Sequence, residues 1–595
     1  MTHERRSHGG TTTAAAPATA LGRPGAGRPR CRLQPRSLLR TAAGVAGGSG
    51  ARADARGPPR VVGRGGGRAG DGLEPAGWSP PVNGPRPRRR AVLKGLAAAG
   101  IVVVAPAVGF AGWVWVDSGR SNTGTLAFRN RLRIPPLLDA TTDADGRRRF
   151  RLELRTGSTE FLPGTRTATW GANGSYLGPT LRARRGDRVA VDVTNRLPET
   201  TSIHWHGMHL PARMDGGPHQ PIARDATWQP YWTVDQPAAT LWYHPHLHQV
   251  TAPHVYRGVA GMFLVDDPAT DDLPLPKRYG VDDVPLIVQD KKIADDGTLD
   301  ESKMTFGGLT VTGLLGDKIL VNGTYDPRFE VTTELVRLRL LNASNARIYH
   351  VGFADDREFA LIAMDAGLLG APERVGRLPL SPGERAEIVV RFAPGDDVVL
   401  KSFPPPLRAN VAYERLAGGD DEHDLVKFVA VDPLRPSPAL PAVLTSTPAP
   451  PPTTGEEFRL TMGDFTFNGR TMEMDRLDRV VGAGTVERWD VVNGQSIPHN
   501  FHVHGASFHV LDVDGGAPPA HLRGVKDTVY VAPGSTVGLA VSFLPHSDPR
   551  SPYMFHCHLL AHEDSGMMGQ FVTVSDADRP LVRGDRLPLT HAHGN

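Results

Sequence analysis

Short runs in which apolar and polar residues alternate cover most of the chain from about Thr123 onward. In residues 186–195, Gly-Asp is followed by Arg-Val-Ala-Val-Asp-Val-Thr-Asn, so valines recur at every second position. A period of two residues is typical of a β-strand with one buried face, and the Gly, Pro and Asn residues between such runs are typical of turns. The pattern predicts an all-β protein built from β-sandwiches.

This strand pattern occurs three times with the same spacing around it. In residues 189–206 a strand ends at Asn, and His residues follow nine and eleven positions later; residues 486–504 repeat the arrangement. Residues 336–353 keep the strand and its Asn but have Val and Phe at the two later positions. A repeated spacing of this kind predicts one structural unit used three times, whose middle copy lacks the histidines.

The expected organisation is three β units, a linker and a tail. The units are expected at 123–270, 275–435 and 456–578, with a Pro-rich linker at 436–454 and a C-terminal tail at 579–595. A linker so rich in proline should be stiff and extended.

The first part of the chain has a different character. Residues 1–85 are rich in Gly, Ala, Arg and Pro and lack an apolar period, which predicts a disordered leader. Residues 86–119 contain Arg88-Arg89-Arg90-Ala91-Val92-Leu93-Lys94 and then an uncharged stretch, 96–116. This order is similar to a twin-arginine export signal, although 96–116 is also long enough to anchor the chain in a membrane. We therefore expect an extracytoplasmic protein, in the periplasm, the cell wall or the medium.

The formal net charge of +4 is an average of two unlike parts. Residues 1–90 hold 17 Arg, no Lys and four acidic residues, a net charge of +13, so the rest of the chain has a net charge of −9. An acidic folded part gives no reason to expect nucleic-acid binding. The 67 Gly and 53 Pro argue against long helices, and two cysteines exclude a disulfide scaffold or a cysteine-only metal site.

Four His-x-His pairs lie in the two outer units. On a strand, residues i and i+2 share a face, so each pair presents two imidazoles side by side. A single pair is most simply a surface feature, but two pairs in each outer unit and none in the middle one predict metal binding. The pairs are His204/His206, His244/His246, His502/His504 and His556/His558.

Cys557 stands between His556 and His558, so its side chain should point to the opposite side of the strand. One strand would then contact two metal sites. Two His, one Cys and one weakly held Met form the ligand set of blue copper. Met568 is an alternative for the methionine, and either methionine could belong to the hydrophobic core instead. The residues that complete the set nearby are His499, His562 and Met567.

The histidine motifs resemble the four copper motifs of the multicopper oxidases. The resemblance covers about 123–578 and is nearest to the bacterial three-domain laccases, the group of the cuprous oxidases and spore-coat laccases. It implies three cupredoxin-like Greek-key β-sandwich domains and a copper-dependent oxidoreductase with O2 as the electron acceptor. The matching segments are His204-Trp205-His206-Gly207, Trp242-Tyr243-His244-Pro245-His246, His499-Asn500-Phe501-His502-Val503-His504-Gly505 and His556-Cys557-His558-Leu559-Leu560-Ala561-His562-Glu563-Asp564-Ser565-Gly566-Met567-Met568.

The resemblance also implies which residues bind four copper ions. In the first unit Pro245 stands at the position that Cys557 has in the third, so the first unit cannot hold a type 1 copper of its own. The middle unit would then be a spacer. The implied ligands are His499, Cys557, His562 and Met567 for one type 1 ion, His204 and His502 for one type 2 ion, and His206, His244, His246, His504, His556 and His558 for two type 3 ions.

By the same resemblance, small donors lose one electron at a time at the type 1 site, and electrons pass through Cys557 to the cluster that reduces O2 to water. Oxygen reduction consumes protons, and motif position assigns their supply to Asp215 and Glu563. The alternative interpretation is that Asp215 is a turn residue before two glycines and that Glu563 is a solvated surface acid. A methionine ligand favours easily oxidised donors, namely phenols, aromatic amines or metal ions. We expect a monomer.

Other functions fit part of this pattern. A ferroxidase or cuprous oxidase would use the same ligands, although the methionine-rich insert of cuprous oxidases is missing here. A copper nitrite reductase would not need all four pairs, and a copper store or carrier would not consume oxygen. A copper-free cell-envelope protein on the same fold would have lost ligands, and none of the twelve is missing. The remaining histidines are interpreted as structural or surface residues, His248, His254, His209, His219, His509, His591 and His593.

Overall fold

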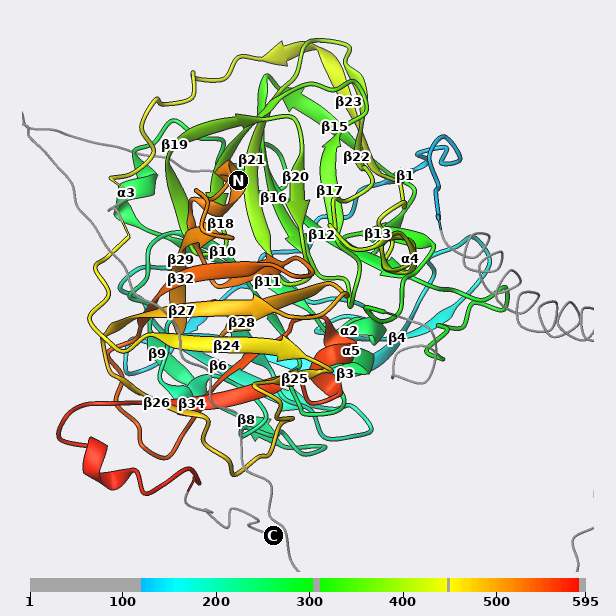
Figure 1. Cartoon of the computed structure of the whole chain (residues 1–595). Helices are drawn as coiled ribbons and strands as arrows, with labels where there is room; N and C mark the ends of the chain where they lie inside the picture. Colours follow the sequence, from blue (N-terminus) through cyan, green and yellow to red (C-terminus); the bar gives the residue numbers. More distant parts are fainter. Residues whose placement is uncertain (1–118, 303–310, 447–449, 588–595) are drawn as a thin grey trace, which may run out of the picture. The chain divides into compact units, whose positions relative to one another are not determined.

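The computed structural model describes residues 119–302, 311–446 and 450–587. The predicted leader, 1–85, and the predicted export signal up to residue 118 lie outside the described residues. Within the described ranges no helix is both long enough and apolar enough to cross a membrane. These ranges form six β-sheets with a few short helices (Figure 1), which confirms the all-β prediction.

Two sheets from residues 141–266 enclose one hydrophobic core. One sheet has the order β2-β3-β6-β8, with β4 beside β3 and β9 beside β6, and the other has the order β5-β11-β10-β7. The alternating valines of β6 lie in this core with Trp205 of β7 and Leu241 of β10, as the period of two residues requires. The strands are β2 (Thr141–Thr142), β3 (Arg148–Thr159), β4 (Thr167–Ala172), β5 (Leu181–Arg184), β6 (Arg188–Asn195), β7 (His204–His206), β8 (Thr227–Trp228), β9 (Tyr231–Thr233), β10 (Ala239–His244) and β11 (Gly261–Asp266).

A second pair of sheets comes from the middle of the chain. Their orders are β1-β15-β23-β22-β17-β20 and β14-β13-β12-β16-β21-β18-β19. The strands are β1 (Asn130–Arg131), β12 (Asp283–Lys291), β13 (Lys318–Val321), β14 (Thr324–Tyr325), β15 (Pro327–Thr333), β16 (Leu335–Asn342), β17 (Tyr349–Phe353), β18 (Phe359–Met364), β19 (Gly367–Val375), β20 (Leu378–Leu380), β21 (Arg385–Arg391), β22 (Asp397–Ser402) and β23 (His423–Arg435). Residues 130–131 pair with β15, so the segment before β2 joins this middle pair, and the predicted unit limits stay a prediction.

The third pair of sheets lies in the C-terminal part. The orders are β25-β24-β27-β32-β29-β30 and β26-β34-β33-β28-β31, and β24, β27, β32 and β29 run side by side in Figure 1. Trp489 of β27, Phe501 of β28 and Phe571 of β34 share the core between these sheets. The strands are β24 (Phe458–Gly463), β25 (Thr466–Phe467), β26 (Arg479–Gly482), β27 (Val486–Asn493), β28 (His499–Val503), β29 (Ala506–Val513), β30 (Val525–Lys526), β31 (Thr528–Val531), β32 (Thr536–Phe543), β33 (Tyr553–His556) and β34 (Met568–Val574).

The helices of the described residues are single turns or a little more, and two of them flank the candidate site. Helices α2 and α5 pack together, because Ala252 and Val255 of α2 share a small apolar cluster with Leu560 of α5. The α-helices are α2 (Thr251–Arg257), α3 (Pro268–Asp271), α4 (Val411–Leu416) and α5 (Leu560–Asp564), and the 3-10 helices are η1 (Ala212–Met214), η2 (Ala520–Leu522) and η3 (Arg579–Leu581).

The three matching strands β6, β16 and β27 end in the same way, at Asn195, Asn342 and Asn493. Each Asn Oδ1 accepts a hydrogen bond from the backbone N–H two residues later, at 2.9–3.0 Å. Each Nδ2 donates to two backbone carbonyls at 2.8–3.0 Å. The side chain therefore replaces backbone partners where the strand ends and turns the chain toward the next strand, which is the physical basis of the repeated spacing.

Gly216 supports a close approach beside the histidine strands. Its φ is +81°, and a Cβ there would lie 1.7 Å from the carbonyl oxygen of Ile203, whereas Gly534 has φ +71° and open space around that position. A left-handed backbone costs an alanine ~1–2 kcal/mol. We expect Gly534→Ala to lose about that much stability and Gly216→Ala to lose several times more or fail to fold. Urea unfolding measures the free energy of unfolding of each variant. Equal losses of stability in the two variants would contradict the steric clash at Gly216.

Candidate metal centre

The histidine pairs lie at the ends of neighbouring strands in the two outer sandwiches. β7 pairs with β10, so that His204 lies opposite His244, and β28 pairs with β33, so that His502 lies opposite His556. The other four members of the pairs lie at or just after the ends of the same strands. All eight residues are buried, with at most 1% of each exposed.

The two outer sandwiches bring these rings together. His204 stacks on His504 with ring centroids 3.8 Å apart, and His206 stacks on His502 at 3.7 Å. Side-chain atoms that could bind a metal lie within 4.8 Å of one another in three groups made only of histidines, each with members from both sandwiches, and in a fourth group of His204, Asp215 and His504. The three histidine groups are His204/His206/His502, His206/His244/His558 and His246/His504/His556. All eight paired histidines of the sequence pattern therefore meet in one place.

The orientation of the rings fits a metal. Nδ1 of His204, His244 and His502 donates to a backbone carbonyl at 2.8–3.0 Å, so the other nitrogen of each ring keeps a lone pair that faces the cluster. Nε2 of His556 lies 3.0 Å from Nε2 of His246 and 3.1 Å from Nε2 of His504. Lone pairs held this close repel one another, and a cation among them turns the repulsion into attraction.

Burial also keeps the rings in the form that binds metal. Desolvation is the largest cause in each of the six rings whose pKa is lowered well below 6.5, and neighbouring imidazoles lower it further. Neutral imidazole is the metal-binding form, so these rings are ready to bind over the ordinary pH range. The six rings are His206, His244, His246, His504, His556 and His558.

A second group forms around Cys557. Its Sγ lies 3.7 Å from Nδ1 of His499 and 3.6 Å from Nδ1 of His562, and these two nitrogens are 3.0 Å apart. Nε2 of His562 donates to the carbonyl of Val311 at 3.0 Å, so in the neutral ring Nδ1 is unprotonated and directs its lone pair toward the sulfur. All three side chains are fully buried. This is the Cys-His-His part of the predicted blue-copper set.

The two candidate methionines lie in different surroundings. Met567 belongs to the core cluster that also holds Cys557 and Leu559, and its backbone carbonyl accepts a hydrogen bond from Cys557 at 3.1 Å. Met568 is on β34 and packs with two other methionines, in a separate cluster. This placement favours Met567 over Met568 as the fourth member of the Cys557 group.

The two sites are joined through neighbouring residues. Cys557 lies in the group with His499 and His562, whereas His556 and His558 on either side of it lie in two different histidine groups. The path between the sites is therefore a few covalent bonds of backbone and side chain. His556 is the last residue of β33, and Cys557 and His558 follow it, so the three side chains enter different groups at the point where the strand ends.

Two carboxylates contact the histidine cluster from outside. Oδ2 of Asp215 accepts a hydrogen bond from Nδ1 of His504 at 2.7 Å. The oxygens of Glu563 lie 3.2 Å from Nδ1 of His556 and 3.5 Å from Nδ1 of His246, and they have no hydrogen-bond partner among the described residues. Both acids are buried, so Glu563 is not a solvated surface acid, and Asp215 is more than a turn residue.

Three residues beside the histidine groups have contacts that the sequence pattern does not predict. Oδ1 of Asn500 accepts a hydrogen bond from the His558 N–H at 2.7 Å and lies 3.5 Å from the sulfur of Cys557. Asp527 contacts histidines of the cluster and forms an ion pair with Arg385 of the middle sandwich. These last two residues are 142 positions apart, so no local motif relates them.

The histidines interpreted as structural take other partners. His254 contacts the Thr201 hydroxyl at 2.9 Å and a carboxylate oxygen of Glu199 at 3.0 Å, and His219 contacts the Gln570 amide at 2.7 Å. Among the described residues, none of His209, His219, His248, His254 or His509 belongs to a group that could hold a metal. His591 and His593 lie outside the described residues.

Comparison with known proteins agrees with this geometry. Family models described as multicopper oxidase match residues 153–270 and 438–577. The laccase-like multicopper oxidase CueO from Ochrobactrum sp. is 36% identical, covers 74% of this chain and 100% of its own, and superposes with a TM-score of 0.67. A laccase from Pediococcus acidilactici is 33% identical, covers 75% of this chain and 94% of its own, and has the same TM-score.

The chain belongs to the multicopper oxidase family. Its similarity to these laccase-like structures confirms the predicted cupredoxin-like sandwiches and the family that the motifs indicate. Membership of the multicopper oxidases implies copper binding, for which the histidine groups are present. Other relatives carry a different name. Proteins named cell division protein FtsP, from Salmonella typhimurium and Escherichia coli, are each 38% identical over 449 residues, which is 74% of this chain and 92% of theirs.

Burial makes Cys557 an unreactive thiol in this multicopper oxidase when no metal is bound. Desolvation raises its pKa to about 12, so almost none is thiolate at pH 8, and the side chain is fully buried. In a metal-free Cys31→Ser variant, which has a single thiol, we expect no reaction with a thiol-exchange reagent at pH 8 in the native state. One thiol per chain should react at once in guanidinium chloride. Rapid reaction of the native protein would contradict the buried site.

Proposed function

We propose that this protein is a laccase-like multicopper oxidase that oxidises small donors one electron at a time and reduces O2 to water with four electrons. The observation that carries the proposal is the pair of adjoining sites: three mixed histidine groups, and a Cys-His-His group joined to them through His556-Cys557-His558. Copper, when bound, supplies electron acceptance at the Cys557 group and oxygen reduction at the histidine groups.

The ligand roles follow the geometric groups. We assign the type 1 site to His499, Cys557, His562 and Met567. Two of the three histidine groups contain neither His204 nor His502, and together they hold the six residues that we assign to the type 3 pair. His204 and His502 are left for the type 2 site. Four copper ions are therefore proposed. The ligands are His204 and His502 for type 2, and His206, His244, His558, His246, His504 and His556 for type 3.

The residues around the sites have distinct tasks. Backbone carbonyls and buried acids hold the outward nitrogens of the rings, and this fixes the direction of the inward lone pairs. Asp215 and Glu563 are proposed to hold and pass the protons that oxygen reduction consumes, because both are buried against cluster histidines. Glu563 is suited to this because its oxygens have no competing hydrogen bond among the described residues.

Electron donors would reach the Cys557 group from outside. The ring of His562 is fully buried beneath the Val311 carbonyl and against Phe465, whose ring centroid is 4.8 Å away. Phe465 is partly exposed, so a planar donor such as a phenol or aromatic amine could approach this ring. We propose such donors as the substrate class, in an extracytoplasmic monomer with residues 96–116 as its candidate membrane anchor. A metal oxidase acting on Fe(II) or Cu(I) is the alternative.

The relatives named cell division protein FtsP supply a second candidate, a role in cell division that does not require oxidase activity. Their identity to this chain is at the level of the laccase-like structures, so the name alone does not decide between the two. The complete ligand set in one geometry supports the oxidase. The experiment below separates the two candidates.

We expect the copper-loaded full chain to consume oxygen with at least one of three donors, a phenol, Fe(II) or Cu(I). A Cys557→Ser variant should lose the blue absorption and the oxygen uptake together, because a hydroxyl cannot replace the thiolate in the site or in the electron path. An oxygen electrode and a visible spectrum measure both. If the loaded wild-type chain takes up no oxygen with any donor, the oxidase proposal fails and the cell-division candidate is favoured.

Removing a proton carrier should slow turnover without unloading the metal. We expect Glu563→Gln to lower kcat by ~10²-fold or more, the usual size of a general-acid effect, with copper content and KM for the donor unchanged. The matched control is Glu456→Gln, because this carboxylate is exposed on the surface. A Glu563→Gln variant with wild-type kcat would show that the protons take another route.

A further inference from the structure

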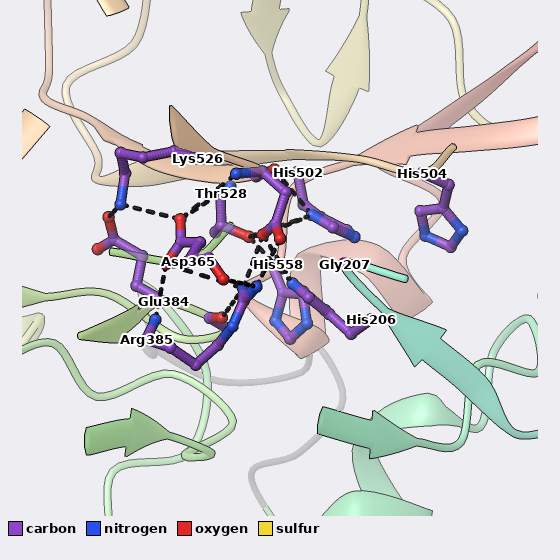
Figure 2. Close-up of polar contacts among 12 residues, drawn as sticks. His206, Gly207, Asp365, Glu384, Arg385, His502, His504, Lys526, Thr528 and His558 are labelled. Carbon is purple, nitrogen blue, oxygen red and sulfur yellow. Dashed lines mark hydrogen bonds and ion pairs between the residues drawn. The ribbon is translucent and has the colours of Figure 1, made fainter. Parts of the chain in front are cut away.

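Arg385, the first residue of β21 in the middle sandwich, lies where all three sandwiches meet (Figure 2), and its side chain is fully buried. Its Nε donates to the carbonyl of Thr240 in the first sandwich at 3.0 Å. Its terminal nitrogens donate to the carbonyls of Gly383 and Asp365 at 3.0 Å each, and to both carboxylate oxygens of Asp527 in the third sandwich at 2.7 and 2.5 Å. A guanidinium has five N–H donors, and these contacts use them all.

Asp527 contacts histidines from both outer sandwiches. Its Oδ1 lies 3.1 Å from Nε2 of His206, and its backbone carbonyl accepts a hydrogen bond from Nδ1 of His502 at 2.8 Å. The hydroxyl of Thr528 donates to the same Oδ1 at 2.8 Å. The ion pair of Arg385 and Asp527 therefore lies directly behind two rings of the cluster.

His206 differs from its neighbours in the nitrogen that it turns inward. His204, His244 and His502 turn Nδ1 outward to a backbone carbonyl, whereas His206 turns Nε2 outward and places Nδ1 3.3 Å from Nε2 of His244. A backbone carbonyl is fixed by the main chain, but a side-chain carboxylate can rotate. Nε2 of His206 also lies 3.1 Å from the Thr528 hydroxyl, which itself donates to Oδ1 of Asp527. The tautomer and the orientation of His206 therefore depend on how firmly the Asp527 carboxylate and this hydroxyl are held together.

The first sandwich is shaped to fit this ion pair. Gly207 follows His206 directly and has φ +83°. A Cβ at Gly207 would lie 2.6 Å from Oδ2 of Asp527 and 2.8 Å from Nη2 of Arg385. Only a residue without a side chain lets the strand that carries His206 approach so closely.

A second buried ion pair holds the first in place. Nζ of Lys526 lies 2.9 Å from Oδ2 of Asp365 and 3.0 Å from Oε1 of Glu384 (Figure 2). Oδ1 of Asp365 accepts the backbone N–H of Arg385 at 2.7 Å. Arg385 is thus fixed through both its backbone and its side chain, and its guanidinium has no room to follow a moving carboxylate.

We propose that Arg385 is a positioning residue for the trinuclear copper site, since it holds the Asp527 carboxylate in the place where His206 must present Nδ1 to the metal. The inference rests on the proposed function, because it assigns His206 to that site. The middle sandwich, expected from the sequence to be a spacer, would then contribute to the metal centre without supplying a ligand.

Two variants test the proposal. Asp527→Asn keeps the shape of the side chain but offers a single acceptor oxygen, and Arg385→Lys keeps the charge but loses the planar fork. In both copper-loaded full-length variants we expect the blue type 1 absorption to stay. The copper content should fall by at least one ion per chain, and the electron paramagnetic resonance spectrum of the remaining cluster copper should change. In crystals of the metal-free variants, the His206 ring should leave its wild-type orientation.

Arg347→Lys is the matched control, because Arg347 is equally buried, pairs with Asp290 at 3.0 Å and with Asp421, and shows no contact with the eight histidines among the described residues. It should lower stability but keep wild-type copper. Equal copper loss in the control and the test variants would overturn the proposal, as would full copper with an unmoved His206. A wild-type chain that binds no copper would instead contradict the proposed function, and the metal-free crystals would still decide what orients His206.

Discussion

Eight buried imidazoles that face one another impose the constraint on which the rest of the structure depends. Their inward lone pairs repel, and in six of the rings burial lowers the pKa, which opposes relief of the repulsion by protonation. The outward nitrogen of each ring therefore needs a hydrogen-bond partner whose position is fixed. Backbone carbonyls in the connections between strands provide this partner for three of the rings, and buried acids contact others. The register of β7 with β10 and of β28 with β33 places His204 opposite His244 and His502 opposite His556.

The buried ion pairs at the junction of the sandwiches meet the same need for fixed positions. Arg385, Lys526 and their acid partners are expensive to desolvate, and a hydrophobic junction between sandwiches would give comparable stability without them. Ion pairs of this kind specify geometry better than they stabilise, because an unpaired charge in the interior is strongly disfavoured and only one arrangement pairs them all. The three sandwiches are therefore held in one relative arrangement at the place where the histidines need it.

The sequence predicted what depends on local spacing. The period of two predicted the strands, the repeated spacing around Asn predicted one unit used three times, and the i, i+2 rule predicted that the members of each histidine pair lie together. Contacts between distant segments had no such signal. Arg385 is one arginine among many, and its partner Asp527 looks like any acid in a short strand, since their pairing exists only once the second and third sandwiches pack together. Asn500 was visible inside a motif, but only the fold shows that its amide touches both Cys557 and the middle sandwich.

The mixed composition of the histidine groups has a consequence for the order of assembly. Every one of the three groups takes residues from both outer sandwiches, so a chain in which only one of them has folded offers no complete group to a metal ion. The Cys557 group, by contrast, comes entirely from the C-terminal sandwich. Residues as distant as His204 and His504 must therefore meet before the larger site exists, whereas the smaller one forms with a single folding unit. A folding intermediate in which only the C-terminal sandwich is formed would offer metal the Cys557 group alone.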